Sequence, residues 1–449
     1  MASRPAGGAA VASDMSTADA LEPAPAVLAP AGQANVVLIG AGFGGLQAAK
    51  KLAGQPDVHL TIIDRRNYHL FQPLLYQVAT AGLDESEIAV PIRAQFARAE
   101  NVEVHLADVD TIDVDHKVVS AGSRRLAYDY LIVATGASHS YFGHPEWEPY
   151  APGLKTVEQA IEMRRRILGA FERAENERDD ALRAACLTFV IVGGGPTGVE
   201  LAGAIADIRR SVLERDFRRI DARSARVLLF QGPPRILPGF DPRLSEKAAR
   251  ALTQLGVEVR TSSRVEHVDG DGVVVAGQRI PAKTVLWAAG VRASSLGHQL
   301  GAAVDHSGRV TVAADLSIPG HPEVFAIGDV ARFELPSGQP APGLAPVAMQ
   351  AGRTAAHNVL ASVRGHARRP FAYHDKGMMA TIGKHKAIVQ AGRLRLTGYL
   401  AWWMWLAVHL FYLVGTASRI RVFGSWVWSY LFSKRGARII VADHWQLEA

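Results

Sequence analysis

Short apolar runs that end at a glycine recur along the chain and predict buried strands. Residues 36–39 run into Gly40, and residues 189–192 run into Gly193. A continuous apolar run of this length, rather than an alternating one, is typical of a strand covered on both faces of a parallel sheet. Further runs of the same kind occupy residues 130–133, 284–289 and 324–327. The pattern predicts an α/β protein in which two distant strand–glycine junctions each begin a nucleotide-binding unit.

The first junction carries the pattern Gly-x-Gly-x-x-Gly. Its residues are Gly40, Ala41, Gly42, Phe43, Gly44 and Gly45. Glycine at these places permits a tight turn, the close approach of a pyrophosphate and close packing of strand on helix, and the helix N-terminus attracts phosphate. A second strand, predicted over residues 60–63, ends at Asp64, whose carboxylate can bond both ribose hydroxyls. These features together predict a dinucleotide site.

The second junction repeats the pattern. Its residues are Gly193, Gly194, Gly195, Pro196, Thr197 and Gly198. The strand predicted over residues 226–230 ends at Gln231, where an acid usually contacts the adenine ribose. Gln231 can bond a hydroxyl without repelling a 2′-phosphate, and Arg235 is near enough in sequence to receive one. The sequence leaves open whether NADH is preferred here or NADPH also binds.

The composition agrees with a Gly-rich α/β globule and excludes several classes of protein. Among 449 residues, 48% are hydrophobic, 20% are charged and 42 are glycine, which excludes a disordered chain or a coiled coil. Cys186 is the only cysteine, so the sequence excludes a disulfide framework, a cysteine-ligated metal cluster and a cysteine-pair redox relay. The 16 histidines follow no zinc-binding spacing, and no metal site is expected.

Two segments lie outside the predicted strands and loops. Residues 1–34 are rich in Ala and Pro and predict a disordered tail rather than a signal peptide. Residues 158–185 carry many Arg and Glu at helical spacing and predict a solvated helix that links the two units.

Positive charge and tryptophan gather near the C-terminus. The net charge is +6, from 49 Lys and Arg against 43 Asp and Glu, yet residues 376–442 hold ten Lys and Arg and no acid. Six of the eight tryptophans lie in the last 48 residues. Basic residues interleaved with Trp argue against a nucleic-acid partner and favour a lipid surface.

The uncharged run over residues 396–418 raises the question of a membrane span. As one helix its 23 residues would be roughly 34 Å long, enough to cross an apolar core of about 30 Å. Gly398, His409 and Gly415 weaken a span, and Trp clusters belong at the membrane interface. We therefore expect an amphipathic anchor in the membrane plane, with a span or a dimer interface as the alternatives.

The motifs taken together resemble the type II NADH:quinone oxidoreductases, flavoproteins with two dinucleotide-binding domains. The matching segments are residues 39–45, 68–79, 128–136, 192–200, 326–330 and 377–383. The resemblance implies an α/β fold with two Rossmann-like domains, arranged as in glutathione reductase, and a C-terminal amphipathic helical membrane anchor. The implied divisions are a tail over 1–34, an FAD-binding domain over 35–155 and 291–370, an NAD(P)H-binding domain over 156–290 and a membrane-anchoring region over 371–449.

The resemblance also implies which residues bind the cofactors. FAD would lie on Gly40, Gly42, Phe43, Gly44, Gly45 and Asp64, with Thr135 and Gly136 against the flavin and Gly328 and Asp329 at its ribityl or pyrophosphate end. NADH or NADPH would lie on Gly193, Gly195, Pro196, Thr197, Gly198 and Gln231. Gly290 and Ala348 are expected to be further cofactor contacts.

Residues 344–350 look like the quinone and flavin-edge motif of that family, although Pro346 stands where a glutamine is usual. Gln350 remains, and Glu200 is carried over as a residue near the nicotinamide and the quinone, so both are expected to be catalytic. The implied activity is transfer of a hydride from NAD(P)H to FAD and of two electrons to quinone, without proton pumping. The implied location is the cytoplasmic face of the inner membrane, and a homodimer is left open.

Other functions compete with this one. A flavin reductase for a protein acceptor such as a ferredoxin and a flavin-binding sensor without turnover both stay open. A sulfide:quinone reductase is disfavoured because it requires cysteines near the flavin, and Cys186 stands alone.

Overall fold

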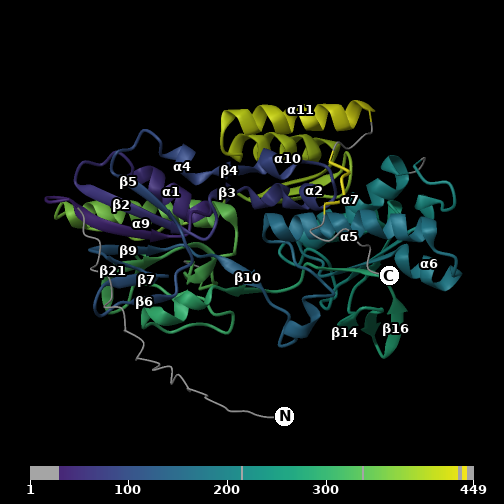
Figure 1. Cartoon of the computed structure of the whole chain (residues 1–449), viewed down its shortest axis with the longest axis horizontal. Coiled ribbons are helices and arrows are strands. Elements are labelled where there is room, and N and C mark those ends of the chain that lie inside the picture. The colour runs from purple at the N-terminus through teal and green to yellow at the C-terminus, as the bar shows by residue number, and fades with distance from the viewer. Residues whose placement is uncertain (1–29, 214–215, 336–337, 433–436, 442–449) are drawn as a thin grey trace, which may run out of the picture.

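The computed structural model describes residues 30–213, 216–335, 338–432 and 437–441. Figure 1 shows two α/β units side by side, with two helices of the C-terminal region lying over the junction between them. Residues 1–29 of the predicted tail lie outside the described part of the chain.

The first unit is built on a six-stranded sheet. Its strands, in order across the sheet, are β20 (Ser317–Ile318), β21 (His321–Ala326), β9 (Tyr130–Val133), β1 (Ala34–Ile39), β2 (Val58–Asp64) and β5 (Val102–Leu106). All neighbours are parallel except β20 and β21. The apolar runs before the first glycine loop and over residues 60–63, 130–133 and 324–327 are therefore confirmed as strands of one sheet.

Two helices pack together on this sheet. The helix α1 (Phe43–Leu52) follows the first glycine loop, and α9 (Ala345–Val363) comes from the far end of the first unit's sequence. A Cβ on Gly352 would lie 2.1 Å from the carbonyl oxygen of Gly44, so the two backbones touch where both residues lack a side chain. The contact brings together two residues that are 308 positions apart in the sequence.

The second unit is built on a four-stranded parallel sheet. Its strands, in order, are β13 (Val257–Arg260), β12 (Arg226–Phe230), β11 (Thr188–Val192) and β17 (Thr284–Trp287). The helix α7 (Pro196–Asp207) follows β11, and α8 (Pro242–Gln254) lies between β12 and β13 in sequence. A smaller antiparallel sheet follows, formed by β14 (Val265–Asp269), β15 (Gly272–Val275) and β16 (Gln278–Pro281).

The chain passes between the units through two paired strands, β10 (Ala137–His139) and β18 (Val291–Ala293). The single solvated helix predicted over residues 158–185 is wrong, because the segment forms α5 (Val157–Asn176) and α6 (Asp180–Cys186). The helix α5 is also half buried. Its fully buried residues are Ala160, Met163, Ile167, Ala170, Phe171 and Ala174, which recur at helical spacing on one face, and of its Arg and Glu only Arg164, 4% exposed, is buried with them.

The C-terminal region begins with an antiparallel sheet of β23 (Met378–Thr381), β24 (Ala387–Ala391) and β25 (Leu394–Gly398). The helices α10 (Tyr399–Tyr412) and α11 (Thr416–Phe432) follow. The uncharged run over residues 396–418 is thus divided among a strand, a helix and a turn at Gly415, whose φ is +86°. Within the described ranges, no helix combines the length and the apolar character needed to cross a membrane.

Short elements complete the first unit and join it to the C-terminal helices. They are β3 (Tyr68–Leu70), β4 (Ala89–Pro91), β6 (Thr111–Asp113), β7 (Val118–Ala121), β8 (Arg124–Ala127), β19 (Val310–Thr311), β22 (Ala331–Arg332), α2 (Leu75–Ala79), α3 (Glu85–Ile88) and α4 (Ile92–Gln95). Of these, α2 lies beneath α10, and α3 packs against α11.

Candidate active site

The two glycine loops share one backbone geometry. Gly40 and Gly193, the first glycine of each loop, have φ of +92° and +110°, which residues with a side chain rarely adopt. A Cβ on the third glycine, Gly45 or Gly198, would lie 1.8 Å from the carbonyl oxygen of the first. Both loops therefore need glycine for the turn itself and for the packing of strand on helix.

The second glycine of each loop is under neither constraint. Gly42 and Gly195 have φ of −66° and −74°, and a Cβ on either would meet no atom of the described residues within 4 Å. Each is the N-cap of the helix that follows, and Pro196 and Thr197 form the first turn of α7 beside Gly195. Glycine here leaves room at a helix N-terminus, where backbone N–H groups favour an anion. A pyrophosphate fits this arrangement in both units.

Two residues of the first loop point elsewhere. The Phe43 ring packs against His69 and Phe71, with ring centroids 5.3 and 5.7 Å away. A Cβ on Gly44 would lie 3.1 Å from the carbonyl oxygen of Ala348 on α9. Both residues pack against other parts of the protein, so the loop offers a ligand their backbone rather than a side chain.

The strand after each loop ends in a side chain that bonds back to the loop. Asp64 accepts a hydrogen bond from the Ala41 N–H at 2.7 Å, and Gln231 accepts one from the Gly194 N–H at 2.7 Å. Burial raises the pKa of Asp64, although two backbone N–H groups that donate to its carboxylate act in the opposite direction. Arg235 lies partly exposed, four residues after Gln231.

A cavity of about 240 Å³ in the first unit brings several predicted residues together. Gly328, Asp329 and Ala348 line it, and so does Ala137, which follows Thr135 and Gly136 in the chain. The Thr135 hydroxyl is buried and has no hydrogen-bond partner among the described residues. An open cavity, with an unpartnered hydroxyl two residues before Ala137 on its wall, fits a bound ring system with polar edges, as a flavin has.

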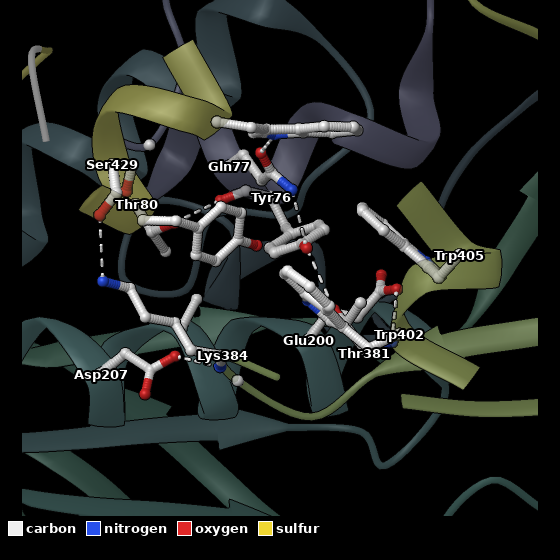
Figure 2. Close-up of a pocket in the computed structure, with 15 residues that line it drawn as sticks. Tyr76, Gln77, Thr80, Glu200, Asp207, Thr381, Lys384, Trp402, Trp405 and Ser429 are labelled. Carbon is white, nitrogen blue, oxygen red and sulfur yellow. Dashed lines mark hydrogen bonds between the residues drawn. The ribbon is translucent and has the colours of Figure 1, made fainter. Parts of the chain in front are cut away.

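A second cavity, shown in Figure 2, lies beneath α10 and α11. Glu200, which is 9% exposed, accepts the Thr381 N–H at 3.3 Å within it. The Tyr76 hydroxyl is 3.0 Å from the Thr381 hydroxyl and accepts a hydrogen bond from the Gln77 amide at 3.0 Å. Burial raises the pKa of Glu200 to about 8, so its carboxyl group carries a proton at neutral pH.

Two further predicted residues are engaged by protein contacts. The Gln350 amide donates to the carbonyl oxygen of His374 at 3.0 Å and accepts the N–H of the same residue at 3.0 Å, and its side chain lines neither cavity described above. Pro346 lies in the first turn of α9, a position that favours proline. A Cβ on Gly290 would lie 2.7 Å from the Phe142 ring, so this glycine permits a close contact. A catalytic role for Gln350 stays a prediction.

The tryptophans of the C-terminal region divide into two groups. Trp402, Trp405 and Trp426 are 3%, 1% and 6% exposed and line the second cavity. Trp403 and Trp428 are 52% and 55% exposed. The expectation that these side chains lie at lipid headgroup depth is therefore wrong for the first three, because they pack inward against α2 and the second unit.

Sequence reasoning missed the polar residues that line the second cavity beside Glu200, among them Tyr76, Gln77 and Asp207. The first two lie in a segment singled out for its resemblance, where a polar pair inside an apolar stretch was the available signal. Asp207 lies seven residues after Glu200, so the two acids fall on one face of a helix, which the sequence could have shown. The sequence could not show that α10 and α11 cover these residues.

Cys186 is buried with a free thiol, and burial raises its pKa. Across the part of the chain that the structure describes, no three His, Cys, Asp or Glu side chains gather as a metal ion would require. The candidate site consists of the two loops and the two cavities.

Comparison with known proteins gives consistent matches over most of the chain. Residues 34–352 match the family described as pyridine nucleotide-disulphide oxidoreductase. The chain is 43% identical over 418 residues to the type II NADH:quinone oxidoreductase Ndh of Mycobacterium tuberculosis, covering 90% of this chain and 89% of that protein. It is 43% identical over 430 residues to NdhA of the same organism, with 92% and 90% covered.

A solved structure shows the same fold. The structure of NDH2 from Plasmodium falciparum in complex with NADH has a TM-score of 0.82 and 19% sequence identity, and the match covers 91% of this chain and 100% of that one. The sulfide:quinone oxidoreductase of Aquifex aeolicus is less similar, with a TM-score of 0.67 over 89% of this chain and 95% of that one, at 19% identity.

Proposed function

Since this chain belongs to the pyridine nucleotide-disulphide oxidoreductase family and, within it, to the type II NADH:quinone oxidoreductases, we propose that it oxidises NADH and reduces a quinone with FAD as its bound cofactor. The observation that carries the proposal is the pair of loops in one chain, each with a second glycine that leaves room at a helix N-terminus. Two dinucleotides, one resident and one exchanging, are what such a pair accommodates.

The first unit holds FAD. The backbone N–H groups after Gly42 face the pyrophosphate, Asp64 bonds the ribose, and the Thr135 hydroxyl finds its partner in the cavity lined by Gly328 and Asp329. When bound, FAD supplies the redox chemistry, because it can accept a hydride from NADH and return two electrons to a quinone. The protein contributes orientation and electrostatics.

The second unit binds NADH. The N-terminus of α7, with Gly195, Pro196 and Thr197 in its first turn, favours the pyrophosphate, and Gln231 lies where a ribose hydroxyl can reach it. Gly193 and Gly198 hold strand and helix close enough for this geometry.

Reduction of a quinone to a quinol consumes two protons, and Glu200 is the group that supplies one. Its carboxyl group is buried and protonated at neutral pH, and Tyr76 and Thr381 are bonded to each other beside it. A protonated carboxyl with a pKa near the working pH is well suited to proton transfer.

The helices α10 and α11 anchor the enzyme in the membrane plane, on the cytoplasmic face of the inner membrane. Large apolar side chains more than half exposed on these helices are Tyr399, Leu400, Trp403, Phe411, Ile420, Phe423, Trp428 and Leu431. Arg419 closes the end of α10 by donating to the carbonyl oxygens of Leu413 and Phe411, both at 2.8 Å. An apolar face with basic residues beside it is typical of a helix pair that lies on anionic lipid.

Steady-state kinetics test the function directly. Purified holoenzyme is mixed with NADH and a water-soluble quinone, and the bleaching of the bound flavin by NADH is followed separately. The proposal expects both flavin bleaching and quinone-dependent NADH oxidation. Bleaching without quinone turnover would favour a protein acceptor, and flavin that NADH does not bleach would favour a sensor.

A further inference from the structure

The second cavity is small and walled in part by aromatic rings, and polar groups line it from one end to the other. Its volume of about 60 Å³ holds on the order of two water molecules and is too small for a quinone ring. Its walls come from α2, α7, the segment around β23, α10 and α11. Figure 2 shows Glu200 at one side of this space and Asp207 with Lys384 at the other.

The Glu200 end of the cavity is lined by buried residues. Glu200 is 9% exposed, and its neighbours Thr381 and Trp405 are 4% and 1% exposed. The Trp405 indole N–H is buried and finds no hydrogen-bond acceptor among the described residues. A buried indole N–H usually has a partner, and here a water molecule in the cavity can serve both it and the Glu200 carboxyl.

The Asp207 end of the cavity leads towards solvent. Asp207 lies seven residues after Glu200 on α7, which places it two turns along the same face and about 10 Å away. One of its carboxylate oxygens accepts the Lys384 N–H at 2.7 Å. Asp207 is itself 8% exposed, but Lys384 and Ser429 beside it are only partly buried.

Among the described residues, five groups on the cavity wall carry a charge or a titrating proton. They are Tyr76 from α2, Glu200 and Asp207 from α7, Lys384 from the turn after β23, and Tyr430 from α11. Tyr76 is bonded to Thr381 and Gln77, and burial raises its pKa further above its usual value. Asp207 is therefore the second carboxyl group on the wall and the one at the end that leads out.

We propose that Asp207 relays protons from solvent to Glu200 through water held in this cavity. The inference rests on the proposed function, because Glu200 must be reprotonated in every turnover if it gives a proton to the quinone. Overall, NADH, one proton and the quinone give NAD⁺ and the quinol. The one proton passes from solvent to Asp207, from Asp207 through water to Glu200, and from Glu200 to an oxygen of the reduced quinone. NADH supplies the two electrons and the other hydrogen of the quinol by the route proposed above, so the relay requires no other reactant.

The test is Asp207→Asn in the full-length holoenzyme. Asparagine keeps an oxygen that can accept the Lys384 N–H, but it cannot carry a proton between water molecules. We expect kcat for quinone reduction to fall about tenfold or more, to fall most steeply at high pH, and to gain a larger solvent isotope effect. Flavin bleaching by NADH under anaerobic conditions, which involves hydride transfer and no relay, should keep its rate.

Two companion variants separate a relay from a structural role. Asp207→Glu restores a carboxyl group and should recover most of the lost kcat. Asp180→Asn makes the same chemical change at a side chain that is 90% exposed on α6 and should leave kcat unchanged. Equal losses of flavin bleaching and quinone turnover in Asp207→Asn, or full quinone turnover in that variant, would overturn the relay. Wild-type enzyme that bleaches with NADH but turns over no quinone would instead overturn the proposed function.

Discussion

Gln231 accepts a hydrogen bond from the Gly194 N–H at 2.7 Å, and this bond repeats, in the second nucleotide-binding unit, the bond between Asp64 and Ala41 in the first. In each unit the donor follows the first glycine of the loop, and the acceptor ends the next strand of the sheet. The repeat places an uncharged amide where the first unit has a carboxylate. The difference bears on which nicotinamide nucleotide the second unit accepts.

Gln231→Glu is expected to suppress turnover of NADPH selectively. A carboxylate at this place bonds a ribose hydroxyl and repels a 2′-phosphate, whereas the amide bonds without repulsion. Two unit charges about 4 Å apart interact by about 4 kcal/mol at an effective dielectric constant near 20. This energy is an upper bound for the change in the discrimination between NADPH and NADH. The measurement is kcat/KM for NADPH and NADH in both proteins. An unchanged ratio would mean that Gln231 does not face the ribose.

Asp64→Ala is expected to weaken the retention of FAD. The side chain is mostly buried and fixed by the N–H groups of Ala41 and Arg66, at 2.7 and 2.8 Å. Hydrogen bonds from a charged group contribute roughly 1.5 to 3 kcal/mol each, so losing the ribose contact should raise the dissociation constant at least tenfold. The flavin released on dilution is measured by its fluorescence. Retention equal to wild type would show that Asp64 does not contact the cofactor.

The glycines of the second loop should respond differently to alanine. Gly198→Ala forces a Cβ to within 1.8 Å of the Gly193 carbonyl oxygen and should unfold the unit or prevent its folding. Gly195→Ala meets no described atom within 4 Å, so the protein should fold and retain FAD while its KM for NADH rises. Circular dichroism and steady-state kinetics separate the two cases. If Gly195→Ala kept the wild-type KM, the pyrophosphate would lie elsewhere.

The stability of the protein should fall with rising pH because of Glu200. The pKa of this group is about 8 in the folded chain, above the ordinary value of 4.5, so the folded state holds more protons than the unfolded state between those values. Stability is therefore lost as pH rises through this window, by on the order of 5 kcal/mol in total. Glu200→Gln should remove that part of the pH dependence. The urea midpoint of each protein is measured at pH 5 and at pH 8. If the midpoint changed with pH by the same amount in both proteins, Glu200 would not be the cause of the pH dependence.

Local signals predicted the sheets and the glycine loops because a strand, a tight turn and a helix start are each fixed by neighbouring residues. The places of Asp64 and Gln231 at the ends of strands were predicted from the same kind of neighbouring residues. The second cavity could not be predicted, since Tyr76, Glu200 and Trp405 meet only when α10 folds back over the junction of the units. The inward placement of three tryptophans depends on the same long-range packing, and so does the bond between Gln350 and the His374 backbone.

The exposed face of α10 and α11 should decide membrane binding. Trp403→Ser combined with Trp428→Ser removes two apolar side chains that are 52% and 55% exposed, while the buried Trp405 stays in place. With about 1 kcal/mol from each half-exposed side chain, partition onto anionic vesicles should fall roughly tenfold or more.

A matched control removes exposed apolar side chains from other faces of the molecule. Leu106→Ser and Leu182→Ser affect side chains that are 61% and 46% exposed on β5 and α6, and they should leave partition unchanged. Flotation of each protein with vesicles, at low and high salt, separates the apolar contribution from the attraction between Lys or Arg and lipid, because only the latter weakens with salt. If both pairs of substitutions changed flotation equally, α10 and α11 would not be the anchor. If the tryptophan pair changed the oligomeric state and left flotation intact, the face would be a dimer interface.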